Sequence, residues 1–432
     1  MNRNDRAITG LVMLAHSLVH TYEFVFPVFI PLWLSQFGTT EAIVGAIVGI
    51  GLSLFGLGAP LAGVLTDRRG SKPLILACLF GMGGSFVLLG LSSTIAGLIG
   101  ISQLSMSGIA IPTELGVVTI ALIVWGVSAS LYHPAGLSLI TRGVEARGSA
   151  FAYHGTAGNI GTALGPLLAT ILLFFLSNNW RVVALILAVP ALIGVAYAVR
   201  INVNETAAVS TATDGGTNET ESGISSLSEF FSLSKTLLAS AFLVVFSIVM
   251  FSGLYYRGVL TFLPSLLGDI GIIAPIEFYG RTIEPANYLY TGLLATGVGG
   301  QYVGGKLTDR IPVELGLTVG YAAFGVVALA FLPITALGLI PFVLLLALLG
   351  FVLFFVQPFY QATVADYTPA SVRGLSYGYT YLGVFGIGAL GTPLAGAALT
   401  YLSLPYLFGL LAVIGGAAAG LSLYLLTAER NR

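Results

Sequence analysis

The sequence predicts an all-α membrane protein in which twelve transmembrane helices form two pseudo-symmetric six-helix bundles. The first observation is composition: of 432 residues, 56% are hydrophobic and 8% are charged, and the mean hydropathy is +0.96, whereas a soluble domain carries about 25% charged residues. The second is a series of apolar stretches of about 20 residues, long enough to cross a bilayer. The third is a Gly-x-Leu-Thr-Asp-Arg hexapeptide that ends two of these stretches, at Gly63–Arg68 and Gly305–Arg310.

The predicted spans follow one another with short connections. Six form an N-terminal bundle over residues 1–200, and six form a C-terminal bundle over residues 236–432. The intervening residues 201–235 are rich in Thr, Ser, Gly and acidic side chains, so they cannot bury enough apolar surface to fold and are expected to be a flexible cytoplasmic linker. The expected spans are 8–34, 42–65, 73–95, 114–141, 149–176, 180–199, 237–267, 288–307, 315–335, 340–365, 374–402 and 405–427.

Basic residues set the expected orientation. With the N-terminus inside, 14 of the 17 Lys and Arg residues fall on the cytoplasmic side, and only Arg181, Arg257 and Arg281 lie in the outer half or outside. Short cytoplasmic loops carry the excess of positive charge in membrane proteins. We therefore expect a multi-pass protein of the cell membrane, surrounded by lipid, with both termini in the cytoplasm.

The two halves match in register beyond the hexapeptide. Phe29–Pro31 in the first predicted helix corresponds to Phe262–Pro264 in the seventh, and Arg147-Gly148 corresponds to Arg373-Gly374. Such a duplication favours a transporter, because two similar halves can rock about a site held between them.

The segment Gly63–Lys72 resembles the signature loop between helices 2 and 3 of the major facilitator superfamily, and the resemblance covers the whole chain. Asp67 can sit against a helix N-terminus and a nearby Arg, which would latch the cytoplasmic side, and Gly63 would allow close helix contact. The second copy departs from the pattern at Ile311-Pro312, so its latch is expected to be weaker; a simple charged turn is the alternative. The expected latch residues are Gly63, Asp67, Arg68, Gly70, Asp309 and Arg310.

The fifth predicted helix carries Gly161, Gly165 and Pro166. This run is similar to the Gly-x-x-x-Gly-Pro element of exporters in the superfamily, although Ala169-Thr170 replaces its trailing glycines. With Tyr132-His133-Pro134, it particularly resembles the fosmidomycin-resistance branch of drug exporters. Plain close packing of helices would explain the glycines equally well.

Ionisable groups inside a bilayer are costly and are therefore functional candidates. His16, His20 and Glu23 lie on one face of the first predicted helix, since 100° per residue brings positions 16 and 23 to within about 20°. We expect Glu23 to carry a proton, with His20 and His16 as relays. Helix-packing histidines are the alternative. A metal at these three positions would lack acidic or thiolate partners elsewhere in the membrane, so neither a metal nor a cofactor is expected.

Arg257 in the seventh predicted helix is one residue from the position equivalent to Glu23. The two could pair across a cavity and separate when substrate or a proton binds. Alternatively, Arg257 extends to the external headgroups. The expected substrate cavity comprises Arg257, Tyr22, Tyr256, His133, Gln357 and Gln361.

The sequence thus predicts secondary active transport by alternating access rather than an enzyme, since no nucleophile or metal constellation is evident. The resemblance implies proton-coupled efflux, by antiport, of a small amphiphilic compound. The alternative is proton-coupled uptake of a small organic anion with Arg257 as its contact. The expected partners are the small-molecule substrate, protons and lipid, with no nucleic acid, and the protein is expected to be a monomer.

Overall fold

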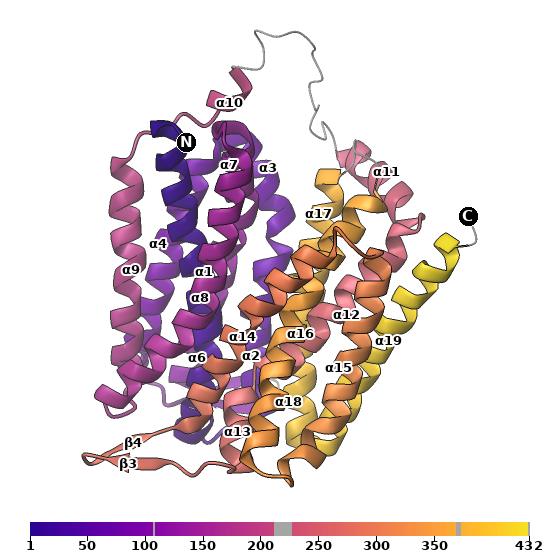
Figure 1. The fold of residues 1–432 in the computed structure, drawn as a ribbon. Coiled ribbons are helices and arrows are strands. Elements are labelled where there is room, and N and C mark those ends of the chain that lie inside the picture. Colours follow the sequence, from indigo (N-terminus) through magenta and orange to yellow (C-terminus); the bar gives the residue numbers. More distant parts are fainter. Residues whose placement is uncertain (107–108, 211–226, 369–372, 431–432) are drawn as a thin grey trace. The chain divides into compact units, whose positions relative to one another are not determined.

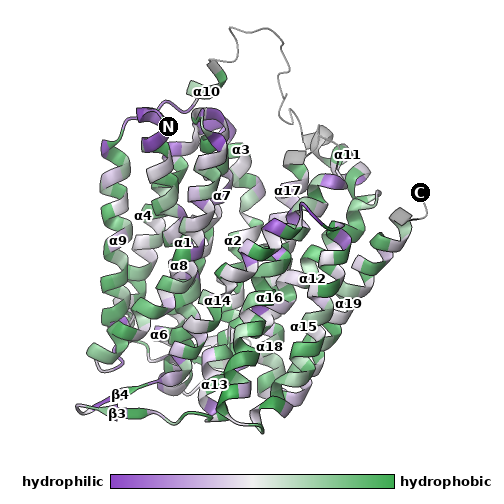
Figure 2. Cartoon of the chain, in the orientation of Figure 1, coloured by the Kyte–Doolittle hydropathy of each residue, from purple (hydrophilic) through white to green (hydrophobic). Residues whose placement is uncertain are grey.

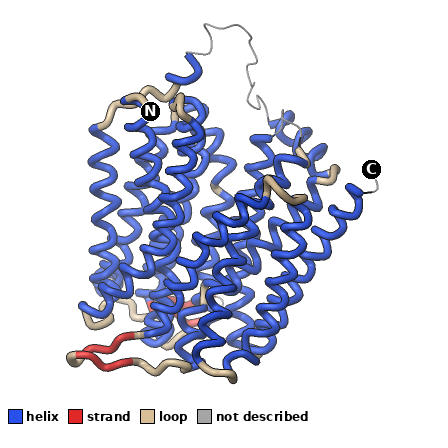
Figure 3. Tube along the Cα trace, viewed as in Figure 1, coloured by secondary structure: helices blue, strands red, loops and turns tan. Residues whose placement is uncertain are grey.

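The computed structural model describes residues 1–432 except 107–108, 211–226, 369–372 and 431–432. Helices make up nearly all of the described chain, and strands occur there in two short antiparallel hairpins (Figures 1 and 3). The chain divides into two compact units. The first comprises Met1–Asn218 with Ala274–Thr291, and the second comprises Glu219–Ile273 with Gly292–Arg432.

The first unit contains the helices of the N-terminal half and both hairpins. Its elements are α1 (Arg3–Phe37), α2 (Glu41–Leu57), α3 (Ala59–Arg69), α4 (Ser71–Gly90), α5 (Ser92–Ile99), β1 (Gln103–Met106), β2 (Ile109–Pro112), α6 (Thr113–Ser130), α7 (Tyr132–Gly143), α8 (Arg147–Phe175), α9 (Trp180–Arg200), α10 (Ala207–Ser210), β3 (Ile276–Phe278) and β4 (Arg281–Ile283).

The second unit contains the remaining helices, of which α14 begins among residues of the first unit. They are α11 (Leu227–Leu238), α12 (Phe242–Leu260), α13 (Leu263–Ile270), α14 (Pro285–Leu307), α15 (Val313–Thr335), α16 (Leu339–Asp366), α17 (Arg373–Tyr381), the π-helix η3 (Leu382–Ile387), the 3-10 turn η4 (Gly388–Leu390), α18 (Gly391–Tyr401) and α19 (Leu404–Arg430).

The number of membrane spans is close to the sequence prediction. Ten described helices are long and apolar enough to cross a membrane, and the bent pair of α2 and α3 adds an eleventh. The glycine-rich α14 has 23 residues, long enough to cross a membrane, but it is not among the helices that are apolar enough. Hydrophobic residues cover these helices, and hydrophilic ones gather at the start of α1 (Figure 2). The expected all-α membrane fold of two helical bundles is confirmed.

Three local features were not predicted. The second span bends by 42° between α2 and α3, because Pro60 follows Gly58 and cannot donate a backbone hydrogen bond to the preceding turn. The eleventh span contains the π-helix η3. Both long loops that the sequence leaves irregular, near 96–112 and 268–287, form β-hairpins.

In the first unit, α1 packs chiefly against α8. The glycines of the expected exporter-like element lie at this contact: a Cβ at Gly161 would overlap the backbone of Ser17, and one at Gly165 would overlap that of Thr21. Small residues allow membrane helices to approach this closely. Pro166 follows within α8.

Two carboxylates accept hydrogen bonds from backbone N–H groups at the end of the first unit where residues 201–209 lie. We call this the linker end. The Asp5 carboxylate is 1% exposed and accepts hydrogen bonds from the backbone N–H groups of Glu145 and Ala146 at 3.1 and 3.3 Å. The Glu205 carboxylate accepts from the first two N–H groups of α4 at 2.6 and 3.0 Å. Carboxylates stabilise helix N-termini in this way.

At the far end of the first unit, an ion pair joins α9 to α6. Arg181 Nη2 lies 2.6 Å from Oε1 of Glu114, which also accepts from Ser92 Oγ at 2.8 Å. The hairpin of β3 and β4 packs against the end of α8, where Arg281 Nη1 donates to the Phe174 carbonyl at 3.0 Å. A segment that follows the linker in sequence therefore belongs to the first unit.

In the second unit, α12 packs against α19, η3 and α18. Its Gly253 sits directly against the backbone of Val384 and Gly388, where a Cβ would not fit. The Tyr255 hydroxyl donates to the Phe324 carbonyl at 2.9 Å and joins α12 to α15.

Candidate functional site

Three titratable side chains of α1 form a hydrogen-bonded chain. Nδ1 of His20 lies 2.6 Å from Oε2 of Glu23, and Nε2 of His20 lies 3.1 Å from Nε2 of His16. Glu23 and His16 are 2% and 8% exposed, whereas 15% of the His20 side chain is exposed. The structure therefore brings into direct contact the three residues that the helical period places on one face.

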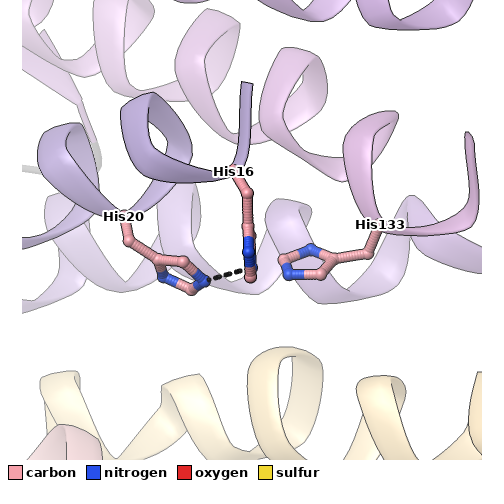
Figure 4. A group of neighbouring side chains, drawn as sticks. All are labelled: His16, His20 and His133. Atoms are coloured by element: carbon pink, nitrogen blue, oxygen red, sulfur yellow. Dashed lines mark hydrogen bonds between the residues drawn. The ribbon is translucent and has the colours of Figure 1, made fainter. Parts of the chain in front are cut away.

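Histidines from α7 and α8 complete a cluster. The ring of His154 stacks on that of His16 with centroids 3.8 Å apart, and the ring of His133 meets it edge-on at 5.3 Å. Figure 4 shows the His16 ring between those of His20 and His133. Tyr132 also stacks on His16, at 5.4 Å. All four histidines of the chain thus meet in the first unit.

The backbone of α8 fixes the orientation of His16. Its Nδ1 lies 2.8 Å from the carbonyl oxygen of His154. Gly158, one turn further along α8, lies against the same ring, and a Cβ there would overlap it. A larger residue at Gly158 would therefore displace His16 from the cluster.

Counting hydrogens shows how many protons this chain holds. Three contacts run from Glu23 through His20 and His16 to the His154 carbonyl, and each needs one hydrogen. The carbonyl can only accept, and a neutral imidazole carries a single N–H. Two neutral histidines and an ionised Glu23 supply two hydrogens, so all three contacts are hydrogen bonds at once only when one more proton is present. That proton can reside on Glu23, His20 or His16 without breaking any of the three contacts.

The same nitrogens also have the placement of metal ligands. One ligand atom each from His16, His20 and His133 lies within 4.8 Å of the other two. The sequence analysis considered a different set, with Glu23 as the third ligand, and expected no metal. In the structure Glu23 bonds instead to the far nitrogen of His20, and α7 supplies His133 in its place.

In the second unit, Arg257 of α12 is buried, with 4% of its surface exposed. Its Cζ lies 5.5 Å from the ring centroid of Tyr256 and 5.6 Å from that of Phe385 in η3. A guanidinium at such distances from aromatic faces is attracted by the ring quadrupoles. The side chain therefore packs among aromatic rings of its own unit and does not extend to the surface.

The other predicted cavity residues differ in their surroundings. Tyr256 and Gln357 are half-buried, and Gln361 is exposed. Tyr22 needs a correction: it is 0% exposed, and its hydroxyl donates to the Leu187 carbonyl at 2.8 Å. Because it is one residue from Glu23, it points about 100° away and packs in the core toward α4 and α9.

The predicted latch residues lie at the ends of α3 and α14. Asp67 and Asp309 are exposed, as are the Arg residues that follow them. A Cβ at Gly63 would meet no described atom within 4 Å, so the close helix contact expected there is not formed among the described residues. Gly70 has φ +83° and lies against the Glu205 carboxylate.

Some polar residues of the structure escaped the sequence analysis. His154 is not among the predicted site residues, yet it stacks on His16 and supplies the carbonyl that orients it. Glu314, in the first turn of α15, is 2% exposed and accepts from the Tyr367 hydroxyl at 3.0 Å. Its signal was visible, because a carboxylate two residues after Pro312 is typical of the first turn of a helix.

The chain matches the family model described as Major Facilitator Superfamily over residues 12–392. It belongs to the major facilitator superfamily. It is therefore a multi-pass membrane protein and a member of a secondary transporter family, which the sequence resemblance predicted. The branch of the family stays a prediction.

Solved structures show the same fold over nearly the whole chain. A bacterial homolog of the human lysosomal transporter Spinster, in an inward-facing and unoccupied conformation, matches with a TM-score of 0.66 and 16% identity, covering 99% of this chain and 96% of that one. A D-xylose-proton symporter matches with a TM-score of 0.70 and 14% identity, covering 97% of both chains. The inward-open xylose transporter XylE from E. coli matches with a TM-score of 0.69 and 14% identity, covering 98% and 95%. No curated protein sequence matches this chain.

Proposed function

We propose that this member of the superfamily works by alternating access as a proton antiporter that exports a small amphiphilic compound. Glu23 is the proton-carrying group, and His20 and His16 relay the proton. We propose export rather than uptake because Gly161 and Gly165 belong to the exporter-like element of α8. We also propose that the protein is a monomer in the cell membrane with both termini in the cytoplasm.

The observation that carries this proposal is the hydrogen count of the Glu23–His20–His16 chain. The complete chain needs one proton beyond those of neutral histidines and a carboxylate. When that proton leaves, one contact is left with two acceptors facing each other, and the two groups repel. Proton release therefore disfavours the present placement of the His20 ring between Glu23 and His16, whereas the contact of His16 with the His154 carbonyl keeps its hydrogen. We propose that this link between protonation and side-chain arrangement is the basis of coupling.

A transport assay tests the proposal. Everted vesicles that contain the protein and hold an acidic interior are exposed to a panel of amphiphilic compounds. An exported compound should release protons from the vesicles in the wild type and should fail to do so with Glu23→Gln. If the wild type accumulates a compound with no proton movement, the proposal is wrong.

One observation favours a second candidate, proton-coupled uptake of a small organic anion. Arg257 is a permanent cation, and it is buried beside the rings of Tyr256 and Phe385. A guanidinium with aromatic neighbours suits a carboxylate or phosphonate on an apolar body. In the same vesicles, uptake would show as anion-induced proton movement in the opposite direction.

The remaining residues have proposed supporting roles. The substrate contacts are Arg257, Tyr256, His133, Gln357 and Gln361. The latch of the conformational cycle comprises Gly63, Asp67, Arg68, Gly70, Asp309 and Arg310. Gly161, Gly165 and Pro166 hold α8 close to α1.

A further inference from the structure

We propose that His16, His20 and His133 form a binding site for a divalent transition-metal ion of the zinc type. Their ligand nitrogens lie within 4.8 Å of one another, and the three rings come from two elements, α1 and α7 (Figure 4). The inference stands on the geometry of these rings and holds whichever substrate and direction the transporter has.

The outward-facing nitrogens of two rings are already arranged as in metal sites. A histidine that ligates a metal usually donates its second ring N–H to a carboxylate or a backbone carbonyl, which fixes the tautomer. Nδ1 of His20 contacts the Glu23 carboxylate, and Nδ1 of His16 contacts the His154 carbonyl. Both kinds of outer partner are therefore present, and both Nε2 atoms turn inward.

The inner nitrogens have nearly the spacing that a metal needs. Zinc–nitrogen bonds of about 2.0–2.1 Å in a tetrahedral site put two ligand nitrogens about 3.3 Å apart. The two Nε2 atoms of His16 and His20 are 3.1 Å apart. The His133 ring lies 5.3 and 5.7 Å from theirs, centroid to centroid. Closing the set requires His133 to approach by about 1.5 Å, which a rotation of its side chain can supply.

Neutral rings would suit a metal in this arrangement. Two neutral imidazoles carry two hydrogens, enough for the outward bonds to Glu23 and to the His154 carbonyl. The Nε2 atoms of His16 and His20 would then face each other as lone pairs, and a cation between them would satisfy both.

The donor set limits which ion binds. Imidazole nitrogens suit zinc, cobalt, nickel and copper, whereas magnesium and calcium prefer oxygen ligands. The Glu23 carboxylate, held by His20, offsets part of the ion's charge. Three protein ligands leave a fourth position open for water.

The experiment measures metal binding by the purified full-length chain, without a histidine tag, in lipid nanodiscs. Titration with Co²⁺ should give one equivalent per chain, with the visible absorption of a tetrahedral nitrogen site, and Zn²⁺ should displace it. His133→Gln should weaken Zn²⁺ binding at least tenfold, measured by calorimetry. His154→Gln is the matched control, because it removes a histidine of the same cluster that is outside the ligand set and keeps its carbonyl; it should bind within about threefold of the wild type.

The proposed site would be refuted if the wild type bound no metal, or if His133→Gln and His154→Gln lost the same amount of Zn²⁺ affinity. X-ray absorption on the Zn²⁺ complex gives a second readout that does not depend on variants: three imidazoles are expected, and scattering from sulfur or from oxygen alone contradicts the assignment. The two proposals fail separately. Metal binding by a chain that moves no protons would refute the coupling and leave the site, and proton coupling without metal binding would do the reverse.

Discussion

The two units bury different charged groups although both contain the Gly-x-Leu-Thr-Asp-Arg segment. The first unit contains Glu23 and all four histidines, side chains that can each hold or release a proton. In the second unit, one residue from the equivalent position, Arg257 keeps its charge at any physiological pH. Both units are helical, and their buried ionisable residues differ. The comparison teaches that the histidines are concentrated in one half, which is where we propose the proton chemistry, whereas the other half buries the cation Arg257.

Glu23→Gln tests the first half of this comparison and should have the largest effect. The Gln amide can donate to Nδ1 of His20 and complete the three contacts without any extra proton. The chain then has no proton to release, so we expect proton-driven transport to fall at least about 100-fold, a typical contribution of a positioned proton-transfer group. The measurement is transport in proteoliposomes with and without a pH gradient.

The matched control for Glu23→Gln is Glu314→Gln, which changes an equally buried acid of the second unit. Its partner is the Tyr367 hydroxyl, and it is not joined to the histidine chain. We expect proton-driven transport within about twofold of the wild type. Equal losses in both variants would mean that buried acids in either half serve the same purpose, and the contrast between the units would disappear.

Arg257→Gln tests the second half. Loss of a charged contact to the substrate costs about 1.5–3 kcal/mol, so KM for an anionic or polar substrate should rise about tenfold or more while the pH response persists. Arg181→Gln, which breaks the ion pair with Glu114 at the far end of the first unit, is the control and should leave KM unchanged. A pH response lost in Arg257→Gln would place proton coupling in both units.

Gly161→Ala should destabilise the first unit and leave the second unaffected. The new Cβ would overlap the Ser17 backbone, and overpacking of this kind costs about 1–3 kcal/mol. Gly155→Ala is a control in the same helix, because a Cβ there meets no described atom within 4 Å, and alanine is favoured over glycine in a helix by about 0.5–1 kcal/mol. Thermal unfolding in detergent should rank Gly155→Ala highest, then wild type, then Gly161→Ala.

The smallest expected effect concerns the hairpin of β3 and β4, which follows the linker in sequence but belongs to the first unit. Burial, and secondarily Glu277, raise the pKa of Glu284 above its ordinary value of 4.5. A raised folded-state pKa means that the folded form binds the proton more tightly, so this contribution to stability is complete below pH 4.5 and is lost as pH rises through the folded pKa.

Hydrogen exchange of residues 276–288 should therefore become faster above that window in the wild type. In Glu284→Gln this pH dependence should vanish after correction for the intrinsic exchange rate. Exchange with the same pH dependence in both proteins would show that the hairpin docks on the first unit without help from this carboxyl group.

Much of the fold could be predicted because hydrophobic length and basic-residue placement act locally. The spans around α1, α8 and α16 differ from their predicted bounds by a few residues. The bend at Pro60 could have been found from its missing N–H group. The π-helix η3 could not, because it depends on the close contact of Gly253 with the backbone of the eleventh span.

Only the part of the site that lies on a single helix could be predicted from the sequence. The period of α1 places His16, His20 and Glu23 together, but the approach of His133 and His154 depends on how α7 and α8 pack. The contact of the Tyr22 hydroxyl with the Leu187 carbonyl could not be predicted either, because it depends on how α1 and α9 pack.

The π-helix η3 has a consequence for motion inside the second unit. A π-turn contains one residue more than an α-turn. The eleventh span therefore has one extra residue at η3. Taking up that residue as regular α-helix would turn the segment that bears Phe385 by about 100° and shift it by about 1.5 Å along the axis. Phe385 would swing off the Arg257 guanidinium, and a rotation within a single helix would uncover or cover the buried charge.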